Sequence, residues 1–155
     1  MGTQQILLIV LSVIIVGAAI AVGIQMFNNQ AYSANKSAIA ADAQSFASQV
    51  VQYFKTPTSQ GGAGGIVTAG MEDEIGSFIG WGSEGTTIDG KSYIIGPVAD
   101  GATTVTIYGL GNEVKDEKRP AVRTIVTLSS GKIDATVIDT DVTTATGLTG
   151  AGVTW

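Results

Sequence analysis

One uninterrupted apolar stretch near the N-terminus limits the folds open to this chain more than any other feature. It runs over Ile6–Ile24, and no charged side chain precedes Lys36. Only Ser12, Gly17 and Gly23 within it are not plainly apolar. As a helix with a rise of about 1.5 Å per residue, it spans nearly the ~30 Å hydrocarbon layer of a bilayer. A helix that is apolar on every face must be buried in lipid or among copies of itself.

The segment before this stretch bears on whether it is retained. Met1 to Gln5 is polar and uncharged, whereas a secretory signal peptide begins with Lys or Arg and ends at a small-residue cleavage site. Ala19-Ile20-Ala21 resembles such a site, but the basic region is missing. We therefore expect the stretch to be kept. Because no basic residue flanks it, the positive-inside rule gives no orientation.

The helical pattern continues beyond Ile24. The segment 25–54 contains neither Pro nor Gly, and its apolar residues recur at intervals of three, four or seven, which predicts one apolar helix face. We expect this face to pack on a sheet through Ile39, Ala43, Phe46, Val50 and Phe54. Lys36 and Asp42 fall on the opposite, polar face. Lys55 suits the end of a helix and Pro57 cannot continue one, so we expect one helix of about fifty residues.

From Lys91 onward the periodicity changes to two, which is typical of strands. The expected strands are Ser92–Val98, Thr103–Tyr108, Ala121–Leu128 and Lys132–Asp139. Turns are expected at residues 99–101 and 129–131. A sheet of this size has one buried face that needs a cover, and the second half of the helix is the obvious one. Residues 71–81 fit a short helix or a loop, and the tail 140–155 has room for one more short strand.

These elements predict an α+β fold, in which a long N-terminal α-helix packs on a small antiparallel sheet of about four strands. We divide the chain into the helix (1–55), whose part 6–24 is expected to be buried in a membrane or among copies of itself, a Gly-rich connector (56–65) and a β-rich domain (66–155). The composition of the connector predicts that it is flexible.

Composition excludes several classes of function. The net charge is −5 and the eight Lys and Arg are scattered, so the basic stripe needed to bind nucleic acid is missing. The chain has neither Cys nor His, which removes disulfides, thiolate metal sites and a conventional catalytic triad. We therefore expect no enzyme activity, no cofactor and no nucleic-acid partner.

A retained apolar segment that runs into an amphipathic helix and then a small antiparallel sheet resembles the type IV pilin family. In that family the first helical half lies in the membrane before assembly and in the filament core afterwards, while the β-domain faces solvent. The chain departs from the family pattern in three ways. If Met1 is the first mature residue, Gln5 stands where pilins carry an acid. Val22, Gly23 and Ile24 occupy the region of the usual Pro, and no Cys can form the usual C-terminal disulfide.

The resemblance implies a structural subunit of a pilus-like filament for surface attachment, adhesion or motility. Its implied partners are identical subunits, the cytoplasmic membrane before assembly, a pilus assembly machinery and a prepilin peptidase. Small residues of the helix allow close approach between helices, although they are also common in ordinary membrane helices. The residues expected to pack between subunits are Gln5, Ile6, Leu7, Leu8, Ile9, Leu11, Val13, Ile14, Gly17, Ala18, Ala21, Gly23, Ile24 and Phe27.

Two alternatives remain open at this point. The chain fits a pseudopilin of a secretion or uptake machine, which would form a short filament that is not displayed on the cell surface. It also fits a single-pass membrane protein whose external β-domain binds a partner as a monomer. Long filaments on the cell surface would favour the pilus, and a detergent-soluble monomer would favour the single-pass protein.

Other candidate sites are weaker. Glu72–Glu74, or the acids at 134, 139 and 141, could contribute to a Ca²⁺ site, but they lack the spacing of an EF-hand loop and a solvated acidic surface is the simpler interpretation. Asn35-Lys36-Ser37 fits the N-glycosylation pattern. Lys115–Arg119 is expected to be an exposed loop of mixed charge rather than a specific subunit contact. The aromatic residues between 27 and 54 are expected to serve packing rather than electron transfer.

Overall fold

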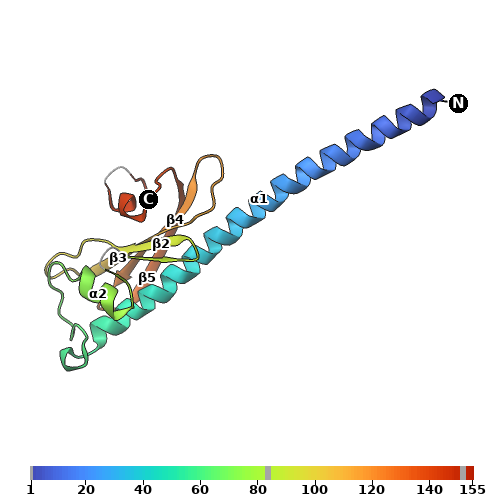
Figure 1. Ribbon diagram of the computed structural model, residues 1–155. Coiled ribbons are helices and arrows are strands. Elements are labelled where there is room, and N and C mark those ends of the chain that lie inside the picture. Colours follow the sequence, from blue (N-terminus) through green and yellow to red (C-terminus); the bar gives the residue numbers. More distant parts are fainter. Residues whose placement is uncertain (1, 83–84, 151–152) are drawn as a thin grey trace.

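The computed structural model describes residues 2–82, 85–150 and 153–155. A long helix is followed by a five-stranded antiparallel sheet (Figure 1). The predicted α+β class, with the helix packed on an antiparallel sheet, is confirmed, although the sheet has five strands instead of about four. The elements are α1 (Gly2–Lys55), the 3-10 helix η1 (Thr58–Gln60), α2 (Glu72–Phe78), β1 (Thr86–Ile88), β2 (Lys91–Ile95), β3 (Thr104–Leu110), β4 (Arg119–Thr127), β5 (Lys132–Thr140) and the 3-10 helix η2 (Ala145–Thr149).

Helix α1 is one unbroken rod of 54 residues, about 80 Å long at ~1.5 Å per residue. Only its second half lies against the sheet, and the first half projects alone (Figure 1). The connector that we expected to be flexible folds back over the helix end. Ala63 N and Gly65 N donate to the carbonyls of Tyr53 (3.0 Å) and Phe54 (2.9 Å), which satisfies two of the carbonyl groups that the end of a helix leaves free.

The strands follow one another in the order β1-β2-β3-β4-β5, and every neighbouring pair is antiparallel. Because successive side chains point to opposite faces, each strand contributes one set to the face beneath α1. Tyr93, Gly109 and Val122 are paired across three strands on this inner face. The turns predicted at residues 99–101 and 129–131 are present, with Gly101 and Gly131 in the left-handed region at φ 65° and 71°.

The strand missing from the prediction is β1, which has only three residues. It pairs with β2 through a turn in which Asp89 and Gly90 both have positive φ, at 51° and 76°. An Asp-Gly pair between two β-prone segments is a strong hairpin signal. The sequence therefore did carry a sign of this hairpin, although the strand itself is too short to show a period of two.

The outer face of the sheet is partly covered as well. The described part of the tail folds across it as η2 rather than as a further strand, and Leu148 and Trp155 pack with Leu110 and Tyr108 of β3. Figure 1 shows the sheet lying between this C-terminal segment and α1. The sheet therefore has apolar contacts on both faces, where the sequence predicted one buried face.

Candidate subunit-packing surface

The first half of α1 is a bare apolar surface. Fifteen large apolar side chains between Ile6 and Phe27 are exposed, from 49% of the surface of Leu11 to 71% of that of Phe27. The helix is long and apolar enough to cross a membrane, and none of its most apolar segment is buried within the chain. Since the core helix of a soluble domain is largely buried, this surface needs a partner outside the chain.

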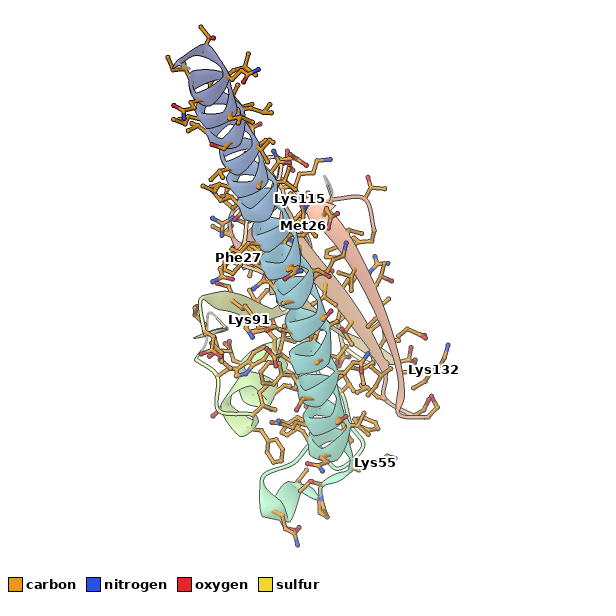
Figure 2. All side chains as sticks on the ribbon, turned by 90° about the vertical axis from the view of Figure 1, so that its right-hand side faces the viewer. Met26, Phe27, Lys55, Lys91, Lys115 and Lys132 are labelled. Carbon is orange, nitrogen blue, oxygen red and sulfur yellow. The ribbon has the colours of Figure 1, made fainter. Side chains whose placement is uncertain are left out.

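The fourteen residues predicted to pack between subunits all lie on this projecting half, and each is exposed. Figure 2 shows Met26 and Phe27 at the end of this half, where the helix meets the β-domain. The first buried residue of the helix is Tyr32. The projecting surface and the part of α1 that belongs to the globular core are thus separate along the helix.

Glycines interrupt the large side chains of this surface. A Cβ atom built on Gly17 or Gly23 would meet no atom within 4 Å, so the fold of the single chain does not require glycine at either position. Glycine inside a helix costs about 1 kcal/mol relative to alanine. Nothing within the described part of the chain offsets that cost.

The one hydroxyl group of the apolar stretch is satisfied within the helix. Ser12 Oγ donates to the carbonyl of Ile9 at 2.7 Å, which is the usual arrangement for serine in a helix that lacks water. With no charged side chain before Lys36, the whole surface can enter lipid or a packed helical core without burying a charge.

The second half of α1 packs on the sheet through the residues that the periodicity selects. Ile39, Ala43 and Val50 are fully buried, and Ile39 and Ala43 pack against Val122 of β4 and Val137 of β5. Fully burying an aliphatic side chain contributes about 1.5–3 kcal/mol. These contacts hold the helix against β4 and β5.

Phe46 and Phe54 are partly buried at the border of the same core. The ring of Phe46 meets Trp81 and Tyr93 edge to face, with centroid distances of 4.7 and 5.1 Å, a favourable geometry for aromatic pairs. The prediction missed Ala47 and Tyr53, which are also buried. The same helical spacing points to both residues, because Ala47 lies four residues after Ala43 and Tyr53 lies three residues after Val50.

A polar cluster, the Asp42 cluster (Asp42, Lys91 and Tyr93), fixes one flank of the helix. Asp42 Oδ2 accepts hydrogen bonds from Lys91 Nζ and Tyr93 Oη, both at 2.7 Å. Partial burial raises the pKa of Asp42, but these two hydrogen bonds outweigh it and leave the pKa below its usual value. Burial, followed by the bond to Asp42, raises the pKa of Tyr93, so its hydroxyl remains a donor.

A second cluster, the Asp139 cluster (Tyr32, Lys36 and Asp139), fixes the other flank. Lys36 Nζ lies 2.8 Å from Asp139 Oδ1 of β5, and this ammonium group lowers the pKa of Asp139. Burial, and then the neighbouring Asp139, raises the pKa of Tyr32. The sequence assignment of Lys36 and Asp42 to the opposite, polar face was therefore wrong: both lie at the border of the packed face, within reach of charged strand residues.

The weaker candidate sites are dispersed. Glu72 Oε2 accepts from Val98 N at 3.2 Å and Glu74 Oε2 from Tyr53 Oη at 3.1 Å. Within residues 2–82, 85–150 and 153–155, no three acidic side chains gather to hold a metal ion. Asn35, the candidate glycan acceptor, donates its Nδ2 to Asn112 Oδ1 at 2.6 Å, so this amide is already engaged.

The aromatic residues fall into separate groups rather than one chain. Phe27 stands exposed on the projecting half, Tyr53 contacts Phe78 of α2 at a centroid distance of 5.1 Å, and Trp155 lies beneath the guanidinium of Arg123 at 5.2 Å. The loop Lys115–Arg119, expected to be exposed, is exposed apart from the half-buried Arg119.

Comparisons of this chain with protein-family models, with curated proteins and with solved structures find no match. The surfaces described above are therefore the features of this chain that bear on its function.

Proposed function

We propose that this chain is a structural subunit of a type IV pilus-like extracellular filament, which polymerises through its apolar N-terminal helix and serves surface attachment, adhesion or motility. The observation that carries the proposal is the bare apolar half of α1 on a fully formed globular domain. Its fifteen large exposed side chains, at about 1.5–3 kcal/mol each when removed from water, represent tens of kcal/mol before entropic costs.

Two environments can bury such a rod on all faces, and the proposal uses both in sequence. A lipid bilayer buries it in the monomer, since the helix is long and apolar enough to cross a membrane. Identical rods bury it once the subunit leaves the bilayer. In this scheme the cytoplasmic membrane holds the monomer, a prepilin peptidase and a pilus assembly machinery act on it, and the sheet domain forms the outer surface.

The glycines favour the filament over a lone membrane anchor. Gly17 and Gly23 destabilise the helix and have no neighbour within the chain. Close approach of a second helix would offset that cost, because small residues let backbones pack closely.

Electron microscopy of material sheared from the cells that make this protein tests the proposal, with immunogold labelling of the β-domain. We expect long filaments that carry the label along their length. Short filaments confined to the cell envelope would instead indicate a pseudopilus. A labelled species that stays monomeric in detergent and never assembles after detergent removal would indicate the single-pass alternative and refute the filament.

A further inference from the structure

The loop between β3 and β4 extends along α1 toward its projecting half. At the base of the loop, Asn112 accepts the 2.6 Å hydrogen bond from Asn35 of the helix. Three residues, from Asn112 to Lys115, can cover at most about 10 Å, which equals the rise of about seven helical residues. Figure 2 accordingly shows Lys115 level with Met26 along the helix. The loop thus reaches the height at which the apolar stretch ends.

The tip of this loop, residues 114–118, is a tight turn. The backbone groups of Lys115 and Lys118 exchange two hydrogen bonds of 2.9 Å, and Asp116 and Glu117 between them have positive φ, at 51° and 63°. Two consecutive residues other than glycine in this region are unfavourable. The tip is therefore a defined hairpin rather than a loose loop, and at its base Val114 leaves 55% of its surface exposed.

The depth of the tip follows from the membrane-spanning length. If Ile6–Ile24 fills the hydrocarbon layer, the headgroup layer beyond it is about 5–7 Å thick, which corresponds to roughly the next four or five residues of the helix. Met26 falls in that layer, and Lys115 lies at its level. We propose that the tip 114–118 contacts the phospholipid headgroups of the bilayer that holds α1, as a second membrane contact of the monomer. This inference rests on the membrane step of the proposed function.

The chemistry of the tip suits a headgroup layer rather than a strongly anionic surface. Val114 supplies an exposed apolar group at the interface, and Lys115 and Lys118 can reach lipid phosphates. Asp116 and Glu117 oppose attraction to anionic lipid, since each basic side chain near such a surface contributes only about 1 kcal/mol. We therefore expect the contact to form on phosphatidylcholine, whose zwitterionic headgroup carries a phosphate but no net charge.

The contact would orient the domain. An apolar stretch that is uniform around its axis sets no preferred rotation in lipid, because rotation and tilt are fixed by neighbours and interfacial anchors. A tip on one side of α1 supplies such an anchor. The contact would then favour a tilt of α1 toward the side that carries the β3–β4 loop. The turn at residues 129–131, which lies beside Val51 and Lys55 at the other end of the packed helix, would stay far from the bilayer.

Because the chain contains no Cys, single fluorescent labels can measure depth in the full-length protein. The chain is labelled at Val114→Cys, at Ser130→Cys as the matched exposed control, and at Ile15→Cys as the reference within the bilayer. Each protein is placed in phosphatidylcholine vesicles and its emission is quenched by nitroxide on the headgroup, by nitroxide on the acyl chain, or by iodide in the water. Circular dichroism before reconstitution verifies that each variant is folded.

We expect headgroup nitroxide to remove most of the emission at position 114 and little at 130, with iodide giving the reverse order. If iodide quenches both positions equally while the acyl-chain nitroxide quenches position 15, the helix is in the membrane and the tip contact is refuted. If the acyl-chain nitroxide fails at position 15, the membrane step itself is refuted, and the tip contact with it. Self-quenching at position 114 that disappears on dilution with unlabelled chain would assign the tip to a neighbouring copy, and also overturn the inference.

Discussion

Thr124 places a hydroxyl group in the fully buried layer between the sheet and α1. Its Oγ1 has no hydrogen-bond partner among the described residues, and a buried polar group without a partner costs about 1–3 kcal/mol. Thr124→Val keeps the side-chain shape and removes the hydroxyl, so we expect the free energy of unfolding to rise by about 1 kcal/mol. Urea titration in detergent measures this free energy of unfolding. The control is Thr104→Val on the exposed outer face, which we expect to change stability by less than about 0.5 kcal/mol.

Gly109 is required by packing rather than by backbone conformation. A Cβ atom at this position would lie 2.8 Å from both Tyr93 Cε1 and Val122 Cγ1, and Tyr93 cannot move freely because it is bonded to Asp42. Gly109→Ala should therefore lower the free energy of unfolding by about 1–3 kcal/mol through overpacking. Thermal unfolding followed by circular dichroism tests this, and an unchanged melting temperature would show that Tyr93 can shift at no cost.

At the scale of elements, α1 is joined to the sheet by an apolar seam with a polar cluster on either side. The Asp42 cluster uses a carboxylate from the helix and a lysine from the sheet, while the Asp139 cluster reverses these roles. Apolar burial supplies most of the stability, but it is not directional. We infer that the two clusters fix the rotation of the helix about its own axis.

Removing one partner of the Asp42 cluster tests this function. Lys91 leaves only 10% of its side chain exposed, so Asp42→Asn leaves a nearly buried ammonium without its counter-charge, and we expect a loss of about 1–3 kcal/mol. The matched control is Asp134→Asn, whose partner Lys132 is 68% exposed, with an expected loss below about 1 kcal/mol. Equal losses for the two variants would contradict the structural role of the cluster.

The same clusters predict an acid dependence. The pKa values of Asp42 and Asp139 are lower in the folded chain than their ordinary value of about 3.9. Each therefore contributes stability that is complete above that pH and is lost as pH falls through the folded pKa. We expect unfolding free energies measured in detergent to decline below about pH 4, and the decline to be shallower in Asp42→Asn. Identical slopes for the two proteins would contradict this assignment.

The prediction from sequence succeeded for elements in which a regular apolar pattern continues over many residues. It failed where contacts between distant parts of the chain determine the structure. The helix and its apolar face follow from the spacings of four and seven residues that Ile39, Ala43 and Val50 illustrate, and four of the five strands follow from a period of two. Lys36 and Asp42 were assigned to solvent because a helical pattern shows which side chains are polar, not which strand residues they meet. The tail was misread because η2 is held by the outer face of the sheet, a contact that no local pattern reveals.

For the whole molecule, the division of α1 into a projecting and a packed half is the property on which assembly depends. The globular part has its own core and buries the helix only from Tyr32 onward, so it can form without the projecting half being covered. A monomer in lipid and a subunit in a filament can then share one fold. Assembly in this scheme exchanges lipid contacts for helix contacts.

That exchange can be separated from membrane insertion by one substitution. Gly17→Leu is not expected to disturb the fold of the single chain, since a Cβ atom at this position meets nothing within 4 Å and the surrounding large side chains of the helix are exposed. The substitution favours both the helix and the bilayer. It would, however, block the close approach of a second helix. We expect normal extraction of the monomer with the membrane fraction, unchanged stability of the β-domain, and loss of most filaments in sheared preparations. Val22→Leu, which enlarges a side chain that is already large, is the control and should assemble normally. Filaments of ordinary length from Gly17→Leu would show that the glycine positions lie outside the contacts between helices. The subunits would then have to pack through the faces of α1 that carry only large side chains.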